Sequence, residues 1–333
     1  MTDSPYQPKI INELFRAVYP SFSMLAGMQL DLFTSLKDGP LDAEQIADAL
    51  GVSAVKLKPL LYALVAAELL TVGGDLFANT GEANHFLVRG SPVYIGEERE
   101  IISDLWNAAL KTAESIRTGI PQAKHDYARM TENELQLFLR GLHPGAVAAG
   151  RDLVAKYHFS SDHTLLDVGG GSGGLAIAVV QACPHLRATV VDLPTVTPIT
   201  ASFVEEAGVA ERVQIVAADV VRDLLIGSFD VAVVKAFIQV LPPDQVGSAF
   251  RNISAAIKPG GVIYILGAGI LDNSRVSPPE VAMFNIVFLN LYDAGQAYTE
   301  QEYKGWLIEA GFEGFERVTF LNGETILRAR KPT

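Results

Sequence analysis

The spacing of apolar residues changes about halfway along the chain. Up to about residue 155, apolar positions recur every three or four residues, as on the buried face of a helix. From His158 onward, short apolar runs alternate with helical stretches, and the β-branched run 229–234 is typical of a strand buried on both faces. This alternation predicts a doubly wound α/β fold. We therefore divide the chain into a mainly helical segment, 1–155, and an α/β segment, 156–333.

The helical segment contains the pattern of a winged helix. Helices are predicted at 10–33, from 41–47 onward and at 54–69, followed by a hairpin of 70–72 with 76–79 around Gly73-Gly74. Pro59 falls inside the third helix, where a mid-helix proline costs about 3 kcal/mol, and less near the first turn. A helix that reads DNA bases needs basic or amide side chains. The helix 54–69 has only Lys56 and Lys58 before an apolar run, so we predict that it packs against protein rather than binding DNA.

The α/β segment predicts seven strands, the last of them antiparallel. Strands are expected at 165–167, 187–191, 213–217, 229–234, 262–266, 316–321 and 325–329, and helices at 175–182, 196–207, 245–257, 283–292 and 299–310. Thr299 and Glu302 form a capping box at the last helix. The run 258–261 closes the helix 245–257, and Asn322-Gly323 is a typical hairpin turn.

Composition and charge exclude several classes of protein. The chain has 333 residues, 49% of them apolar, yet no apolar run approaches the 18 or so residues of a membrane span, and the polar N-terminus is not a signal peptide. The single cysteine, Cys183, excludes an internal disulfide and a cysteine-based zinc site, and no His/Asp/Glu cluster has metal-ligand spacing. A net charge of −12 without a basic stripe disfavours nucleic acid. We expect a cytoplasmic protein with no membrane, nucleic-acid or metal partner.

A glycine-rich turn follows the first strand of the α/β segment. Residues 167–173 satisfy D-x-G-x-G-x-G, which suits S-adenosylmethionine, while 169–174 satisfy G-x-G-x-x-G, which suits a dinucleotide. Glycine lets the backbone approach a ligand closely. The next strand ends in Asp192, whose carboxylate can accept hydrogen bonds from both ribose hydroxyls. The turn predicts a nucleoside-containing cofactor but does not distinguish S-adenosylmethionine from a dinucleotide.

An ordered set of motifs covers nearly the whole chain. After the winged helix and the glycine turn come Val191-Asp192-Leu193-Pro194, Ala217-Ala218-Asp219, Lys258-Pro259-Gly260-Gly261 and the run from Thr299 to Phe312. In this set the chain resembles the small-molecule S-adenosylmethionine-dependent O-methyltransferases, the family of caffeate, acetylserotonin and bacterial polyketide O-methyltransferases. The resemblance implies a Rossmann-like methyltransferase sheet of seven strands, an N-terminal winged-helix dimerisation domain, a homodimer, and S-adenosyl-L-methionine as cofactor.

The resemblance also implies which residues hold the methionine end of the cofactor. Asp167, with the backbone at Gly169 and Gly171, would hold the amino group, and Lys235 would face the carboxylate. The alternative for Lys235, directly after a buried strand, is a solvated strand end.

A second set of residues is implied at the adenosine end. Asp192 would accept the ribose hydroxyls, Leu193 would pack on the adenine, and Asp219 and Val220 would bracket that base. Each hydrogen bond to a carboxylate is worth about 1.5–3 kcal/mol. The alternative for Asp219 is a helix N-cap or loop acid.

The catalytic base of the family is missing. Its histidine position, four residues after Lys235, is occupied by Gln239, which cannot accept a proton at neutral pH. The acids that orient that histidine fall, by register, at Gly267 and near Ala297. A base contributes about 10²–10⁴ in rate, whereas holding the reactants in line contributes about 7–11 kcal/mol. Methyl transfer can therefore proceed without a base where the acceptor is already ionised or carbon-centred. The Gln239 amide can orient an acceptor oxygen by a hydrogen bond.

One histidine is a candidate acid or base in place of the missing one. His143, before Pro144, lies in the segment that lines the substrate chamber in relatives, and the alternative is a histidine at a helix end. The remaining histidines are predicted to be surface or packing residues: His85, His125, His158, His163 and His185. The helix 283–292 is expected over the substrate, with Asn285, Asn290 and Tyr292 as polar groups, or else as a core helix.

The sequence thus predicts methyl transfer from S-adenosylmethionine to a small aromatic or polyketide-like molecule, with Gln239 in place of the base. The alternative is a divergent relative that binds the cofactor and catalyses a non-methylating reaction. Substrate, pathway, and the choice between oxygen and carbon as the methylated atom are not specified by the sequence.

Overall fold

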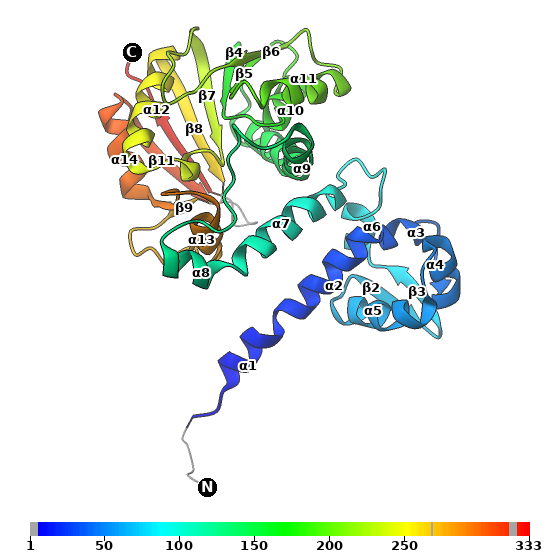
Figure 1. The fold of residues 1–333 in the computed structure, drawn as a ribbon. Helices are drawn as coiled ribbons and strands as arrows, with labels where there is room; N and C mark the ends of the chain where they lie inside the picture. The colour runs from blue at the N-terminus through cyan, green and yellow to red at the C-terminus, as the bar shows by residue number, and fades with distance from the viewer. Residues whose placement is uncertain (1–5, 268, 320–324) are drawn as a thin grey trace. The chain divides into compact units, whose positions relative to one another are not determined.

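A computed structural model describes residues 6–267, 269–319 and 325–333, and the chain divides into two compact units, one ending at Ser103 and the other Asp104–Thr333 (Figure 1). Residues 104–155 belong to the second unit. The predicted boundary at 155/156 is a functional one: residues 1–155 are expected to form the dimerisation and substrate-cap segment, and residues 156–333 the cofactor-binding segment. This division stays a prediction.

The N-terminal unit has the predicted hairpin and the two helices before it, while the predicted helix 10–33 is divided into three. Its elements are α1 (Lys9–Arg16), α2 (Val18–Gln29), α3 (Leu32–Ser35), β1 (Leu41–Asp42), α4 (Ala43–Leu50), α5 (Ala54–Ala66), β2 (Leu70–Gly73), β3 (Leu76–Asn79), α6 (Gly81–Phe86), a 3-10 turn (Gly96–Glu98) and the start of α7 (Arg99–Ala109). The strands form an antiparallel sheet in the order β1-β3-β2. Asp42 and Gln45 form a capping box that starts α4. Pro59 lies in the interior of α5, where buried Leu61 and Leu64 pack into the core of the unit.

The second unit is built on a seven-stranded sheet in the order β11-β12-β8-β7-β4-β5-β6. Its strands are β4 (Thr164–Val168), β5 (Arg187–Asp192), β6 (Val213–Ala217), β7 (Phe229–Lys235), β8 (Ile257–Gly267), β11 (Glu313–Thr319) and β12 (Thr325–Arg330). β4 pairs in parallel with β5 and β7, and β12 is antiparallel to both neighbours. This confirms the predicted fold class.

Helices cover both faces of this sheet (Figure 1). The helices on these faces are α9 (Glu132–Tyr157), α10 (Gly174–Ala182), α11 (Thr197–Glu206), α12 (Pro243–Ala256) and α14 (Glu300–Glu309). The unit also contains α8 (Thr112–Thr118) and α13 (Pro279–Leu291), which are hydrogen-bonded to each other, and a 3-10 turn at Ile238–Val240. Side chains alternate along each strand, so Leu165 packs in the core beneath α9–α11 and Leu166 in the core beneath α12 and α14. The chain reverses its direction of travel across the sheet at β4, and ligands of such sheets bind at that switch point.

Two further local predictions differ from the structure, and one short strand pair was not predicted. Pro144 lies inside α9 rather than beyond a helix end, and Leu135, Leu139 and Leu153 bury one face of this helix against the core on both sides of the proline. The run 258–261 follows α12 directly but already belongs to β8. The short parallel pair β9 (Ile270–Leu271) with β10 (Tyr298–Thr299) had no sequence signal. The predicted turn Asn322-Gly323 lies outside the described residues, whereas the capping box of Thr299 and Glu302 is confirmed.

In the described ranges, no single helix is long and apolar enough to cross a membrane; α4 and α5 pass a length and composition test only as a pair bent by 112°.

Candidate functional site

The glycine turn connects β4 to α10 in a shape that side chains would block. Gly169 donates its backbone N–H to the Val191 carbonyl oxygen at 2.8 Å, which fixes the turn against the end of β5. Gly169 and Gly171 have φ values of 62° and 56°, in the left-handed region that favours glycine. A Cβ on Gly169 would lie 2.8 Å from the Phe237 ring. The turn therefore leaves bare backbone at the switch point of the sheet.

Asp192 ends β5 and holds the turn. Its Oδ2 accepts the Gly171 N–H at 2.8 Å and its Oδ1 accepts the Leu193 N–H at 2.7 Å. Burial raises the pKa of Asp192, and the two backbone hydrogen bonds oppose that shift. Each oxygen keeps a further lone pair, so the carboxylate can still accept two hydroxyl donors.

Asp167 lies on β4 and is fully buried. Its Oδ2 accepts the Ala176 N–H at 3.3 Å, while its Oδ1 has no hydrogen-bond partner among the described residues. Burial raises the pKa of Asp167 to about 7, and the charge of Lys235 at the end of β7 lowers it in part. A buried carboxylate oxygen without a donor is costly. Its position beside the turn fits a cationic group on a ligand.

The predicted adenine residues lie on neighbouring loops. The Ala218 N–H donates to the Asp192 carbonyl oxygen at 2.9 Å, which brings the loop after β6 to the end of β5. The Asp219 carboxylate accepts the Val221 N–H at 3.0 Å, as in its alternative role as a loop acid. Val220 is buried in the core, while Leu193 stays half-buried. Contact of these residues with adenine stays a prediction.

Gln239 lies in the 3-10 turn after β7. The side chain is 7% exposed, and a Cβ on Gly269 would lie 3.3 Å from its Oε1. At the positions where the resemblance places the two acids, Gly267 ends β8 and Ala297 is fully buried. Neither position therefore supplies a carboxylate that could orient the Gln239 side chain.

His143 supports the glycine turn from the middle of α9. Its Nδ1 lies 2.9 Å from Ser172 Oγ, and its ring stacks on Phe203 at 4.6 Å with an interplanar angle of 18°. Burial, together with the charge of Arg140, lowers the pKa of His143 to about 4. The alternative of a helix-end histidine is wrong, because α9 continues past Pro144 to Tyr157.

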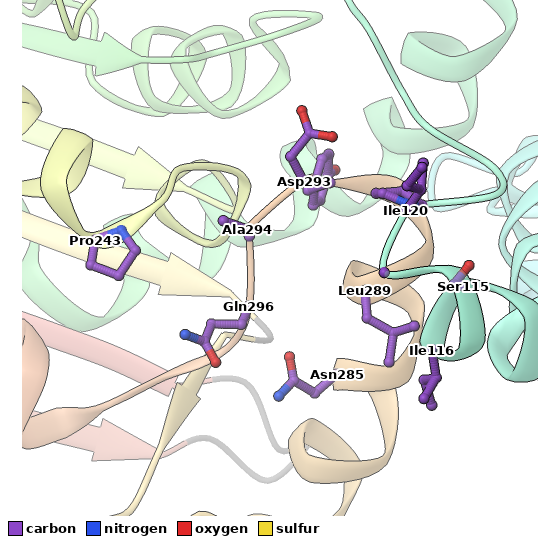
Figure 2. Close-up of a pocket in the computed structure, with 13 residues that line it drawn as sticks. Ser115, Ile116, Ile120, Pro243, Asn285, Leu289, Asp293, Ala294 and Gln296 are labelled. Carbon is purple, nitrogen blue, oxygen red and sulfur yellow. The ribbon is translucent and has the colours of Figure 1, made fainter.

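A pocket of about 570 Å³ adjoins α13. Figure 2 shows Asn285 projecting from α13 toward the segment that carries Gln296. It is lined by Ser115, Ile116, Gly119, Ile120, Pro121, Pro243, Asn285, Leu289, Tyr292, Asp293, Ala294, Gly295 and Gln296. Asn290, predicted as a pocket group, is instead fully buried and bonded to Ser115 Oγ at 2.6 Å. The pocket therefore takes two of the three predicted polar groups, Asn285 and Tyr292.

The segment before α9 holds polar residues that the sequence did not single out. Tyr127 Oη lies 2.8 Å from Tyr292 Oη, and burial raises the pKa of both phenols, that of Tyr292 to about 12. His125, predicted as a surface or packing residue, has an 8% exposed side chain whose Nε2 lies 2.8 Å from Asp104 Oδ2. These residues lie outside any motif, so only the three-dimensional structure brings them together.

No group of three or more His, Cys, Asp or Glu residues in the described part of the chain could hold a metal ion.

Comparisons with known proteins agree with this architecture. A model of the O-methyltransferase domain matches residues 112–313, and one of the O-methyltransferase dimerisation domain matches 12–89. The chain is 28% identical over 318 residues to 3-hydroxy-5-methyl-1-naphthoate 3-O-methyltransferase of Streptomyces sahachiroi, covering 94% of this chain and 92% of that one. It is 27% identical over 331 residues to the tetracenomycin polyketide synthesis 8-O-methyl transferase of Streptomyces glaucescens, covering 98% and 97%. Human N-acetylserotonin methyltransferase, solved in complex with SAM, has the same fold, with a TM-score of 0.84, 23% identity and full coverage of both chains.

Proposed function

This chain belongs to the S-adenosylmethionine-dependent O-methyltransferase family, and we propose that it methylates a hydroxyl group on a small aromatic or polyketide-like acceptor. The observation that carries the proposal is a buried carboxylate, Asp167, and a half-buried one, Asp192, beside a glycine turn at the switch point of the sheet. The naphthoate and polyketide acceptors named for the two relatives support the acceptor class.

The residues at the turn fit S-adenosylmethionine. The unpartnered Oδ1 of Asp167 suits its ammonium group, and Asp192 suits two ribose hydroxyls. Lys235, whose charge reaches Asp167, suits the cofactor carboxylate. When bound, the cofactor supplies an electrophilic methyl group on a sulfonium. The protein's own contribution is to hold donor and acceptor in line, which is worth about 7–11 kcal/mol.

Gln239 is proposed to orient the acceptor rather than to deprotonate it. Its amide is buried beside Gly269, in the 3-10 turn that follows β7, four residues after Lys235 at the end of that strand. An amide donates and accepts hydrogen bonds but does not take up a proton at neutral pH. A phenol with a pKa near 10 is about one-thousandth ionised at pH 7. Either the acceptor is acidic, or another residue takes the proton.

Transfer of a labelled methyl group tests the proposal. We expect the wild-type protein to move label from methyl-labelled S-adenosylmethionine onto 3-hydroxy-5-methyl-1-naphthoate or related hydroxyarenes, with one S-adenosylhomocysteine formed per product. The matching 3-methoxy compound is the control, because its hydroxyl is blocked; label on it would mean transfer to carbon or to the carboxylate, which alkaline hydrolysis of the methyl ester distinguishes. Conversion of an acceptor without label would instead support a non-methylating relative, which the residues at 239, 267 and 297 make the second candidate.

Cofactor affinity should depend on pH through Asp167. Its pKa of about 7 in the free protein lies above the ordinary value, so the carboxyl is protonated below pH 7. Pairing with an ammonium group requires the carboxylate, so binding releases a proton there and affinity rises with pH. We expect the affinity for S-adenosylhomocysteine to rise up to about tenfold per pH unit from pH 5 to 7 and to level off above.

Calorimetry in two buffers of different ionisation enthalpy measures that released proton directly. The Asp167→Asn variant should lose the pH dependence while keeping the shape of the side chain. A wild-type affinity that is flat from pH 5 to 7 would contradict the role given to Asp167.

The N-terminal unit is proposed to form a homodimer. Residues 12–89 match a dimerisation domain, and Ile10, Ile11, Leu14 and Phe15 on α1 each expose 66–71% of their surface. An apolar stripe of this kind marks an interaction site. A net charge of −12 and the few basic residues of α5 support a small-molecule acceptor rather than nucleic acid.

A further inference from the structure

We propose that His125, oriented by Asp104, is the general base that takes the acceptor's hydroxyl proton, in place of the residue at position 239. The inference rests on the proposed function and names the group that deprotonates an acceptor too weakly acidic to ionise alone. Both residues belong to the second unit, Asp104 on α7 and His125 in the loop before α9.

The hydrogen bond to Asp104 fixes the state of the imidazole. His125 Nε2 lies 2.8 Å from Asp104 Oδ2, so in the neutral ring Nε2 carries the hydrogen and donates it to the carboxylate. Nδ1 is then the atom with the free lone pair. A carboxylate that orients an imidazole and stabilises its protonated form is the arrangement that activates hydroxyl nucleophiles in other enzymes.

The free nitrogen is buried and has no partner. Nδ1 of His125 makes no hydrogen bond within the described ranges and is closed to solvent. The edges of two half-buried rings surround the imidazole, Phe138 at 5.1 Å and Tyr127 at 6.0 Å between centroids. A buried acceptor without a donor is unfavourable. A ligand hydroxyl entering between these rings would supply the missing donor.

His125 lies on a segment that contacts both the pocket wall and the loop after Asp192. Its backbone N–H donates to the Leu291 carbonyl oxygen at 3.0 Å, which holds it against the end of α13. Two residues on, the Tyr127 phenol reaches Tyr292 of the pocket wall. The Tyr127 carbonyl oxygen accepts a hydrogen bond from Thr195, just after Asp192, at 2.9 Å. The segment of His125 and Tyr127 therefore contacts both the pocket wall and the loop after Asp192.

Charged and titratable groups lie near His125 on α7 and on its own loop. Asp104 faces it from α7 and Tyr127 from its own loop, and Tyr292 at the end of α13 is hydrogen-bonded to Tyr127. Beside it, Lys124 is paired with Asp293. Phe138 faces it from α9 and carries no charge. The group in direct contact with the imidazole is therefore an anion, which stabilises the imidazolium that proton uptake creates.

The proposed step is balanced. The acceptor oxygen gives its proton to His125 Nδ1 and forms a bond to the methyl carbon, while the carbon–sulfur bond of the sulfonium breaks and its electron pair stays on sulfur. The imidazolium, paired with Asp104, then returns the proton to water. A methyl ether and a neutral thioether leave the site.

Two acceptors that differ in acidity test the role of His125. They are 3-hydroxy-5-methyl-1-naphthoate and a nitro-substituted analogue whose hydroxyl is already ionised at pH 7. We expect His125→Gln to lower kcat/KM about 10²- to 10⁴-fold for the first and less than about tenfold for the second, since an ionised oxygen needs no base. Asp104→Asn should show the same pattern more weakly. His85→Gln, an exposed histidine of the N-terminal unit, is the control and should change neither. Equal losses with both acceptors, or no loss, would overturn the proposal.

A second readout keeps this test separate from that of the proposed function. If wild-type protein transfers label to no acceptor, the proposed function fails, and His125 is still decided by side-chain ¹⁵N NMR with S-adenosylhomocysteine and the un-nitrated naphthoate. Upfield movement of the His125 Nδ1 resonance on adding the naphthoate supports the contact. An unmoved resonance at saturating naphthoate overturns it.

Discussion

Replacing Asp192 with alanine should weaken the binding of S-adenosylhomocysteine by about 10²- to 10⁴-fold. The expected loss follows from two hydrogen bonds between ribose hydroxyls and the carboxylate, each worth about 1.5–3 kcal/mol. The same side chain accepts the Gly171 and Leu193 N–H groups, so its removal also loosens the glycine turn. Isothermal titration calorimetry measures the affinity, and Asp192→Asn keeps the side-chain shape while removing the charge.

Asp230→Ala is the matched control for that experiment. Asp230 starts β7 and accepts hydrogen bonds from the backbone and hydroxyl of Thr164 and from Lys258, which hold its pKa at about 2. Because Thr164 begins β4, this acid lies at the end of the strands away from the glycine turn. Its loss should lower stability and leave the affinity within about twofold. Similar affinities for the Asp192 and Asp230 variants would remove Asp192 from the ribose site.

Replacing Gly150 with alanine should lower the free energy of unfolding by about 1–3 kcal/mol. Gly150 lies on α9 where that helix crosses α10, and a Cβ there would lie 2.7 Å from the Leu175 carbonyl oxygen and 2.8 Å from Ala178 Cβ. A backbone carbonyl inside α10 cannot move aside without shifting the helix. Because α9 also carries His143, which holds Ser172 of the glycine turn, the variant should bind S-adenosylhomocysteine more weakly as well.

Gly305→Ala makes the same change at a helical position without the crowding. Gly305 is exposed on α14, and no atom lies within 4 Å of its added Cβ. Alanine gains about 0.5–1 kcal/mol over glycine in a helix, so this variant should be stabilised. Urea denaturation of the two full-length variants measures the difference. Stabilisation of both would mean that α9 and α10 are not in close contact at Gly150.

Local patterns in the sequence specified the parts of the site that depend on neighbours along the chain. The glycine spacing and the acids that end strands predicted the turn, Asp167 and Asp192, because strand ends on one edge of a parallel sheet meet in space. The absence of acids at Gly267 and Ala297 was likewise visible before the fold was known. The seven strands followed from the alternation of apolar runs.

Distant pairings were not predictable in this way. Tyr127 and Tyr292 are 165 residues apart, and neither they nor Asp104 and His125 lie in a motif. Pro144 is a local signal for a helix end, but burial of the leucines of α9 overrides it. Asn290 had the spacing of a pocket residue, yet its amide is used to join α13 to α8. In each case, contacts between residues that are distant in the sequence determine the outcome, and local sequence patterns do not reveal them.

A crystal structure with bound S-adenosylhomocysteine tests most directly where this protein holds its methyl donor. We expect both ribose hydroxyls within hydrogen-bond distance of the Asp192 oxygens and the amino group on Asp167 Oδ1. A ligand bound elsewhere, or a ribose that does not reach Asp192, would contradict it.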